Sequence, residues 1–160
     1  MQAVPVPDPQ PRVFTGIADL EAAVGHLLGR SEWCTVTQER ITAFADATGD
    51  HQWIHVDPDR AASGPFGGTI AHGYLTLSLL PVLLRDIYRI EGVRMAVNYG
   101  CNRLRFPAAV PVGSRLRAGA TLARVERTEH GARMTVDVVV EREGGDKPVC
   151  IAESVTVLFM

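Results

Sequence analysis

The chain has 160 residues, of which 46% are hydrophobic and 21% are charged, and its formal net charge is −2. These values are typical of one globular domain and exclude a fibrous or wholly disordered chain. Because 16 basic side chains stand against 18 acidic ones, no excess of one sign favours binding to nucleic acid or to a membrane surface.

The N-terminal segment is the first feature along the chain. Prolines alternate between positions 5 and 11, which predicts a flexible, Pro-rich segment over residues 1–12 and a single domain over residues 13–160. Apolar residues at helical spacing then predict a short amphipathic helix over residues 17–28. Residues 33–36 predict a brief strand.

A second helix is predicted over residues 38–48. Thr37 can cap its beginning, and Gly49 is a typical residue at a helix end. Residues 50–68 have no sustained period and contain two prolines and three glycines, so we expect a loop with at most short helical turns. Residues 69–88 then predict one buried helix, which Pro81 should kink or break.

After Gly92 the hydrophobic pattern changes to a period of two residues. Strands are predicted over 94–106, around 116–122, around 134–140 and over 149–159, with turns at 110–113, 129–131 and 144–146. The simplest packing wraps this antiparallel sheet around the buried helix, which gives an α+β fold. A sheet of this kind leaves edge strands open, and open edges favour dimerisation.

Cysteine usage and hydropathy bear on the compartment. Cys34, Cys101 and Cys150 are widely spaced and form no CxxC pair, which predicts reduced thiols in a cytoplasmic protein. The N-terminus has no basic region followed by an apolar run, so we expect no signal peptide. The longest apolar tract, residues 74–84, is much shorter than the roughly 20 residues of a transmembrane helix.

Polar groups capable of chemistry are concentrated in the predicted loop. Asp50 follows the end of the 38–48 helix, where the helix dipole disfavours a negative charge, and Phe44, Trp53 and Ile54 would remove the carboxyl from water. A carboxyl in that setting can donate a proton. His55 lies five residues further on, so both side chains could hold one water as an acid/base pair. The alternative is that Asp50 caps a turn and His55 is structural.

Two other interpretations concern the same stretch. His51, His55 and His72 could form a three-histidine metal site, although the flanking Gly49 and Pro58 disfavour the helix that this spacing needs. Backbone N–H groups in the first turn of the buried helix could bind a developing oxyanion. Gly73, which has no side chain to block a substrate carbonyl, would supply one; alternatively it permits close packing of helix on sheet.

The motif Phe44-Ala-Asp-Ala-Thr-Gly-Asp-His-Gln-Trp-Ile-His55 resembles the active-site loop of the MaoC-like (R)-specific enoyl-CoA hydratases, which reads Gly-Asp-x-Asn-Pro-(Ile/Leu)-His. The stretch Ala71-His72-Gly73 resembles the beginning of that family's central helix. Residues 105–113 resemble its Phe-x-x-Pro-Val-x-x-Gly segment. Together these matches cover about residues 30–160.

The resemblance implies a hot-dog fold, in which an antiparallel sheet wraps around a long central helix, usually in a homodimer. It implies reversible addition of water to a trans-2-enoyl thioester of coenzyme A or acyl carrier protein, without a cofactor or metal. Asp50 and His55 would be the catalytic pair, and the Gly73 amide would face the thioester oxygen.

The sequence departs from the family motif at two positions. Gln52 replaces the usual Asn and can still orient His55 or the substrate, and Trp53 replaces Pro and can reshape the mouth of the pocket. We therefore expect Gln52, Trp53 and His72 to be substrate-binding residues. Two alternative functions use the same fold: a non-catalytic subunit that binds acyl-CoA, and an acyl-CoA thioesterase.

Overall fold

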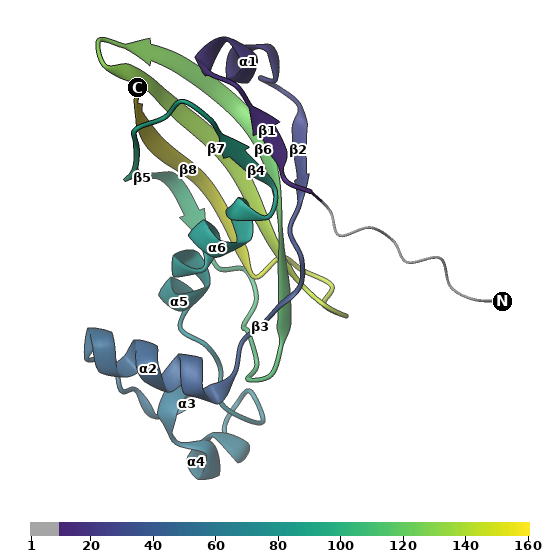
Figure 1. The fold of residues 1–160 in the computed structure, drawn as a ribbon. Coiled ribbons are helices and arrows are strands. Elements are labelled where there is room, and N and C mark those ends of the chain that lie inside the picture. Colours follow the sequence, from purple (N-terminus) through teal and green to yellow (C-terminus); the bar gives the residue numbers. More distant parts are fainter. Residues whose placement is uncertain (1–9) are drawn as a thin grey trace, which may run out of the picture.

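Four long antiparallel strands make up most of the chain after residue 94 in the computed structural model, which describes residues 10–160 (Figure 1). Their positions confirm the strands predicted from the period-two pattern, and the turns between them also fall where predicted. The strands are β5 (Met95–Arg105), β6 (Arg115–Thr128), β7 (Gly131–Arg142) and β8 (Cys150–Phe159).

The sheet follows the order β2-β6-β7-β8-β5, where β2 is Leu27–Arg30. The short strand β3 (Cys34–Thr35), predicted within residues 33–36, also pairs with β6. Strand β5 therefore forms one edge of the sheet. A separate parallel pair joins β1 (Arg12–Phe14) to β4 (Tyr88–Ile90). The prediction of a flexible segment falls largely on residues 1–9, outside the described residues.

Two consecutive short helices, α5 (Gly73–Ser78) and α6 (Leu80–Arg85), lie against one face of the sheet (Figure 1). Alternate residues of β6 and β7 point toward them, and each is at most 2% exposed. These residues form one apolar core with the helices: Leu116, Ala118, Ala120 and Leu122 on β6, and Met134, Val136, Val138 and Val140 on β7. This arrangement confirms the predicted sheet around a buried helix.

The central helix is shorter than predicted. Pro81 lies in the first turn of α6 and marks the predicted break, but the helical part covers only residues 73–85 instead of 69–88. Residues 70–71 are extended because Ala71 N–H donates to the carbonyl of Val110 at 2.8 Å and Ile70 bridges to Pro111. None of the helices within residues 10–160 is long and apolar enough to cross a membrane.

The helix predicted over residues 17–28 is wrong in its second half. Helix α1 covers only Ile17–Ala22, and the chain then turns into β2. Gly25 has a left-handed φ of +84°, and its N–H donates to the carbonyl of Leu122 at 2.7 Å. Pairing with β6 therefore overrides the helical pattern of the apolar residues.

Helix α2 (Gln38–Thr48) begins and ends where the sequence predicts. The Thr37 hydroxyl accepts a hydrogen bond from the N–H of Arg40 at 3.4 Å, and Gly49 closes the helix with a left-handed φ of +77°. The next residues form two short helical turns, α3 (Trp53–Val56) and α4 (Pro58–Ala62), as expected. With α2 they form a helical cluster beside the beginning of α5 (Figure 1).

Changing Gly49 to Ala tests the turn that leads into the predicted loop. No atom lies within 4 Å of the added methyl group, so the cost comes from the left-handed backbone alone. We expect the free energy of unfolding in urea to fall by about 1–2 kcal/mol. Gly68 is equally open but has no positive φ. The Gly68→Ala control should change stability by less than about 0.5 kcal/mol, and equal losses in both variants would contradict this explanation.

Candidate active site

Asp50, His55 and His72 converge where the predicted loop meets the beginning of α5. Each contributes one side-chain nitrogen or oxygen, and these three atoms lie within 4.8 Å of one another. Asp50 follows the Gly49 turn, His55 lies on α3, and His72 precedes α5. The structure therefore brings the sequence-predicted pair together and adds a second imidazole.

The imidazole of His55 is buried and fixed in orientation. His55 is only 6% exposed, and its Nδ1 lies 2.6 Å from the carbonyl oxygen of Ile70. A carbonyl can only accept, so Nδ1 donates and the neutral ring keeps an unprotonated Nε2. Burial lowers the pKa of His55, with a smaller contribution from His72, and outweighs the opposite effects of the Ile70 hydrogen bond and the charge of Asp50. His55 is therefore neutral near pH 7.

His72 packs directly against this ring. The two imidazoles stack with centroids 3.7 Å apart at 24°, and Phe44 contacts His72 with ring centroids 4.9 Å apart. Nε2 of His72 donates to the backbone carbonyl of Asp50 at 3.0 Å, whereas its buried Nδ1 has no partner among the described residues. His72 thus connects the candidate pair: it hydrogen bonds to the backbone of Asp50 and packs on one face of the His55 ring.

Gln38 joins this loop to two other segments of the chain through side-chain hydrogen bonds. The side-chain amide of Gln38, in the first turn of α2, donates to the backbone carbonyl of His55 at 2.8 Å. Its carbonyl oxygen accepts from the hydroxyl of Thr69 at 2.6 Å. Three separate segments therefore meet at Gln38. No local sequence signal marks it, because its partners lie 17 and 31 residues away.

Asp50 is exposed in this chain, so the predicted removal of its carboxyl from water by Phe44, Trp53 and Ile54 is wrong for the isolated chain. Oδ1 accepts a hydrogen bond from the N–H of Gln52 at 3.4 Å, at the beginning of α3. The carboxylate therefore stands beside the buried imidazole but faces solvent, where a water or a substrate can reach it.

The two positions that depart from the family motif differ in their surroundings. Gln52 is exposed and its backbone carbonyl accepts from the N–H of His55 at 2.9 Å. The indole of Trp53 lies under the guanidinium of Arg60, which is 4.4 Å from the ring centroid, and packs close to Gly64. Trp53 thus joins α3 to α4, and its contact with substrate stays a prediction.

Gly73 is the first residue of α5, so its N–H has no acceptor within the helix. A methyl group added at Gly73 would lie 2.7 Å from the ring of Phe106. The space left by the missing side chain is therefore occupied by an aromatic ring, which favours the packing interpretation of the glycine. An N–H that has no acceptor within the helix can still donate to an oxyanion.

The three-histidine cluster, which the sequence offers only as a disfavoured alternative, does not form. His51 is exposed and hydrogen bonds through Nε2 to Asp46 at 2.8 Å, whereas Asp50 takes its place beside His55 and His72. In this cluster one nitrogen of each histidine is already engaged with a backbone carbonyl. A carboxylate beside a free imidazole nitrogen is also the arrangement that holds a water for proton transfer.

An antiparallel sheet wrapped around a central helix, with an Asp/His pair on the loop before that helix, defines a hot-dog protein of the hydratase type. The chain belongs to the MaoC-like dehydratase family, because the family's MaoC like domain matches residues 19–144. Among solved structures, the (R)-hydratase from A. caviae involved in PHA biosynthesis is 27% identical with a TM-score of 0.69, covering 84% of this chain and 96% of that one.

Two curated relatives are more similar in sequence. The 3-hydroxyacyl-thioester dehydratase Z of Mycobacterium tuberculosis is 58% identical over 145 residues, which is 90% of this chain and 96% of the relative. Nodulation protein N of Rhizobium leguminosarum bv. viciae is 46% identical over 147 residues, covering 89% and 90% respectively. The fold and family predicted from the sequence are therefore confirmed.

A double-mutant cycle between Gln38 and Thr69 measures the energetic coupling between these two hydrogen-bonded side chains. Both side chains lie inside the hydrogen-bonded junction, so Gln38→Ala and Thr69→Val should each lower the free energy of unfolding, and the losses should not add. We expect a coupling energy of about 0.5–3 kcal/mol from urea unfolding of the two single variants and the double variant. Additive losses would show that Gln38 does not act through Thr69.

Proposed function

We propose that this protein catalyses the reversible dehydration of (R)-3-hydroxyacyl thioesters, equivalently the addition of water to trans-2-enoyl thioesters. The observation that carries the proposal is the neutral imidazole of His55, whose ring is fixed by Ile70 and stands beside the carboxylate of Asp50. The 58% identical relative is itself named a 3-hydroxyacyl-thioester dehydratase, which supports the reaction class.

In the hydration direction, one water lies between Asp50 and His55. Nε2 of His55 accepts a proton from this water while the carboxylate of Asp50 orients it through the other hydrogen. The hydroxide adds to C3 of the enoyl group, and the proton then passes from the imidazolium to C2. No proton is gained or lost overall, and the negative charge of Asp50 stabilises the transient imidazolium. Dehydration uses the same steps in reverse.

The electrons displaced from the double bond move onto the thioester oxygen as an enolate. The N–H of Gly73, free at the beginning of α5, would donate to that oxygen. Catalysis then needs only groups that the chain supplies: a base, an orienting carboxylate and a backbone donor. Gln52 and Trp53 stay predicted substrate-binding residues, and His72 acts through its contacts with Asp50 and His55.

Asp50→Asn tests the proposal because it preserves the shape of the side chain but removes its charge. We expect kcat for hydration of crotonyl-CoA, followed by the loss of enoyl absorbance, to fall by about 10²–10⁴-fold. Asp50 is exposed, so the variant should fold normally. Asp46→Asn, an exposed carboxyl that pairs with His51, is the matched control and should retain wild-type turnover.

Thiol release and acyl-CoA binding, measured beside the enoyl absorbance, separate the alternative functions. A thioesterase would release free coenzyme A thiol at the rate at which the substrate disappears, whereas a hydratase consumes the double bond and leaves the thioester intact. A non-catalytic subunit would bind acyl-CoA without turnover. Equal hydration rates for wild type and Asp50→Asn would reject the assigned site.

The pH profile of the reaction should identify His55 as the base. Hydration requires the neutral imidazole, so kcat/KM is lost as the pH falls through the pKa of His55 in the folded protein. Burial lowers this pKa below 6.5, so the acid limb of the profile should have its midpoint below pH 6.5.

The neighbouring His51 provides the control for that profile, because its hydrogen bond with Asp46 raises its pKa above 6.5. The His51→Gln variant should therefore leave the midpoint unchanged. If the acid midpoint lies above pH 6.5 and disappears in His51→Gln, the base is His51, and the assignment of His55 is wrong.

We infer that the protein is a homodimer in which β5 pairs with β5 of a second copy. Strand β5 ends the sheet on one side, and ten of its eleven residues are exposed, including Met95, Val97 and Tyr99 at 48%, 41% and 66%. An exposed apolar edge strand of this length invites pairing, and a two-fold axis lets the same strand pair with itself. The substrate carrier, coenzyme A or acyl carrier protein, and a cytoplasmic location stay predictions from the sequence.

Lysines on β5 should abolish this pairing. The Met95→Lys, Val97→Lys double variant should elute as a monomer of 17.3 kDa in size-exclusion chromatography with light scattering, whereas wild type should elute at about twice that mass. Ile151→Lys changes an equally exposed apolar residue on β8, away from the edge, and should remain dimeric. A wild-type monomer at micromolar concentration would contradict the dimer.

A further inference from the structure

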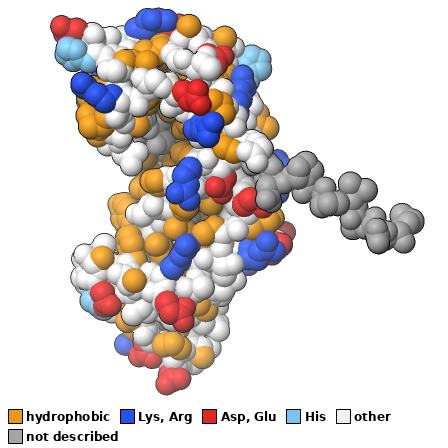
Figure 2. Space-filling view, viewed as in Figure 1, with side chains coloured by type: hydrophobic (Ala, Val, Ile, Leu, Met, Phe, Trp, Pro, Cys, Tyr) orange, Lys and Arg blue, Asp and Glu red, His pale blue; other side chains and the backbone are white. Residues whose placement is uncertain are grey.

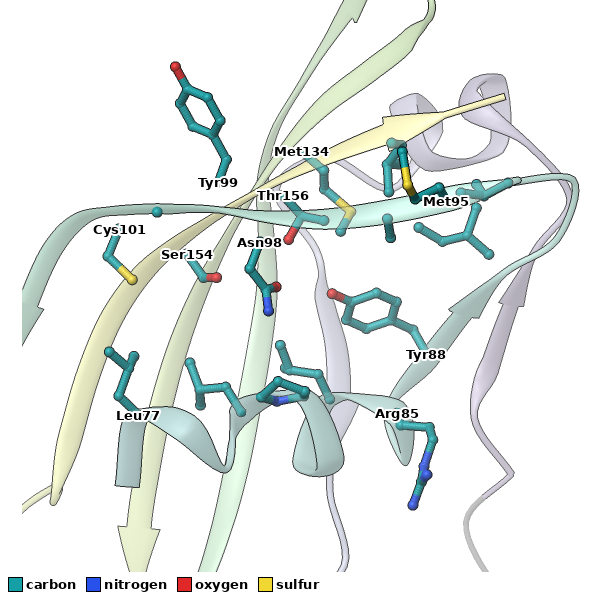
Figure 3. A pocket seen from close by; sticks show the side chains of 18 of the residues that line it. Leu77, Arg85, Tyr88, Met95, Asn98, Tyr99, Cys101, Met134, Ser154 and Thr156 are labelled. Carbon is teal, nitrogen blue, oxygen red and sulfur yellow. The ribbon is translucent and has the colours of Figure 1, made fainter. Parts of the chain in front are cut away.

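A cavity of about 660 Å³ lies between the helices α5 and α6 and the strands β5 and β8 (Figure 3). Leu77 and Ser78 line it, one helical turn beyond Gly73, so it begins next to the proposed oxyanion donor. The surface is hollowed at the corresponding waist of the molecule, with hydrophobic side chains gathered around it (Figure 2). Its volume is that of an ordinary small-molecule site.

Four of the neutral polar residues that line this cavity lie close together on its strand side: Tyr88, Asn98, Ser154 and Thr156. The lining also includes Ser78, Tyr99, Arg85 and Arg94. Tyr88, from β4, points its hydroxyl toward Asn98 and Thr156, and the side chains of Asn98 and Ser154 point toward the helix (Figure 3). Asn98 and Thr156 are directly opposite each other on β5 and β8. Donors and acceptors from three strands therefore converge on one space.

This polarity is local and departs from the pattern of the sheet. The helix-facing positions of β6 and β7 are all apolar, as described above, and on β8 the flanking positions in the same alternating row, Ala152 and Leu158, are buried and apolar. Ser154 and Thr156 interrupt that row within the part of β8 that lines the cavity, which also includes Leu158. A cavity that served only a hydrocarbon chain would not need this interruption.

The four side chains also have unused hydrogen-bonding capacity. Within residues 10–160 the structure gives none of them a hydrogen-bond partner, whereas Ser78, on the opposite wall, uses its hydroxyl on the carbonyl of Tyr74 at 2.7 Å. Burial raises the pKa of Tyr88 to about 12, so its hydroxyl remains a donor at physiological pH. These groups must bond to water or to a ligand.

We propose that this cavity takes the acyl chain of the thioester and selects chains that carry a hydroxyl or carbonyl oxygen beyond the reacting carbons. The inference rests on the proposed function for the position of the thioester. A saturated hydrocarbon tail would displace water from the four polar groups and leave them unpaired, which disfavours its binding. An oxygen-bearing tail replaces that water and satisfies them. The four converging groups are neutral donors and acceptors, so the class we propose is a neutral oxygen; Arg85 and Arg94 also line the cavity.

Isothermal titration calorimetry with unreactive ligands tests the selection without requiring turnover. The ligands are saturated acyl-CoAs of six, eight, ten and twelve carbons, each paired with its ω-hydroxylated counterpart. We expect the hydroxylated ligand to bind wild type at least about tenfold more tightly at one or more of these lengths, because sites built to hydrogen bond a ligand group reject analogues lacking it. Equal or weaker binding of every hydroxylated ligand would overturn the inference, as would no binding of any pair.

Two variants assign the selection to the cavity. Tyr88→Phe and Thr156→Val each remove one hydroxyl with little change in shape, and each should reduce the preference for the hydroxylated ligand at least about threefold. Tyr99→Phe is the matched control: Tyr99 is among the residues that line the cavity, but its ring projects away from the helix side of β5 (Figure 3), so its preference should equal that of wild type. An unchanged preference in both Tyr88→Phe and Thr156→Val would overturn the assignment.

Hydration of crotonyl-CoA by the same preparations separates this inference from the proposed function. Its four-carbon acyl group has no tail to enter the cavity, so wild-type turnover reports on the proposed function alone, and urea unfolding of Tyr88→Phe and Thr156→Val shows that both variants fold. Normal crotonyl-CoA hydration without a preference for oxygenated chains rejects the inference alone. Absence of hydration in wild type rejects the proposed function instead, and the binding preference is then judged on the titrations.

Discussion

The hydrogen bond from Nδ1 of His55 to the carbonyl of Ile70 is the interaction on which the site depends. It joins the loop after α2 to the extended segment before α5, which are otherwise separate in the chain. It also fixes which ring nitrogen carries the proton, and therefore which one remains free to act as a base. Gln38 donates to the backbone carbonyl of the same histidine, so His55 is held both at its ring and at its backbone.

Burial of this histidine has a thermodynamic cost that the fold uses for chemistry. Taking the ring out of water favours its neutral form, which is the form that can accept a proton. Asp50 is exposed to solvent, and in the proposed mechanism its carboxylate lies close enough to the ring to favour the imidazolium when it forms. In the proposed mechanism, the buried imidazole is the base and the exposed carboxylate orients the water, so one pair of residues holds and releases the proton.

The sequence predicts well those features that are encoded locally. Helix α2 was predictable because its cap and its terminating glycine are adjacent to it, and the Asp50/His55 pair because both lie on one short loop. Two predicted helices are shorter in the structure than expected, and both for the same reason: residues at their ends form hydrogen bonds to distant parts of the chain. Gly25 pairs with β6, and Ala71 with the turn before it, so long-range hydrogen bonds override an apolar pattern of helical period. The partners of Gln38 could not be predicted for the same reason.

Strand β5 takes part in two features of the molecule. One of its faces lines the cavity, and its free edge is the surface on which a second copy would assemble. Any movement that separates two subunits would also loosen a wall of the acyl site. In the proposed dimer, dilution would then alter the range of accepted chains as well as the specific activity, so selectivity would depend on the assembled pair and on enzyme concentration.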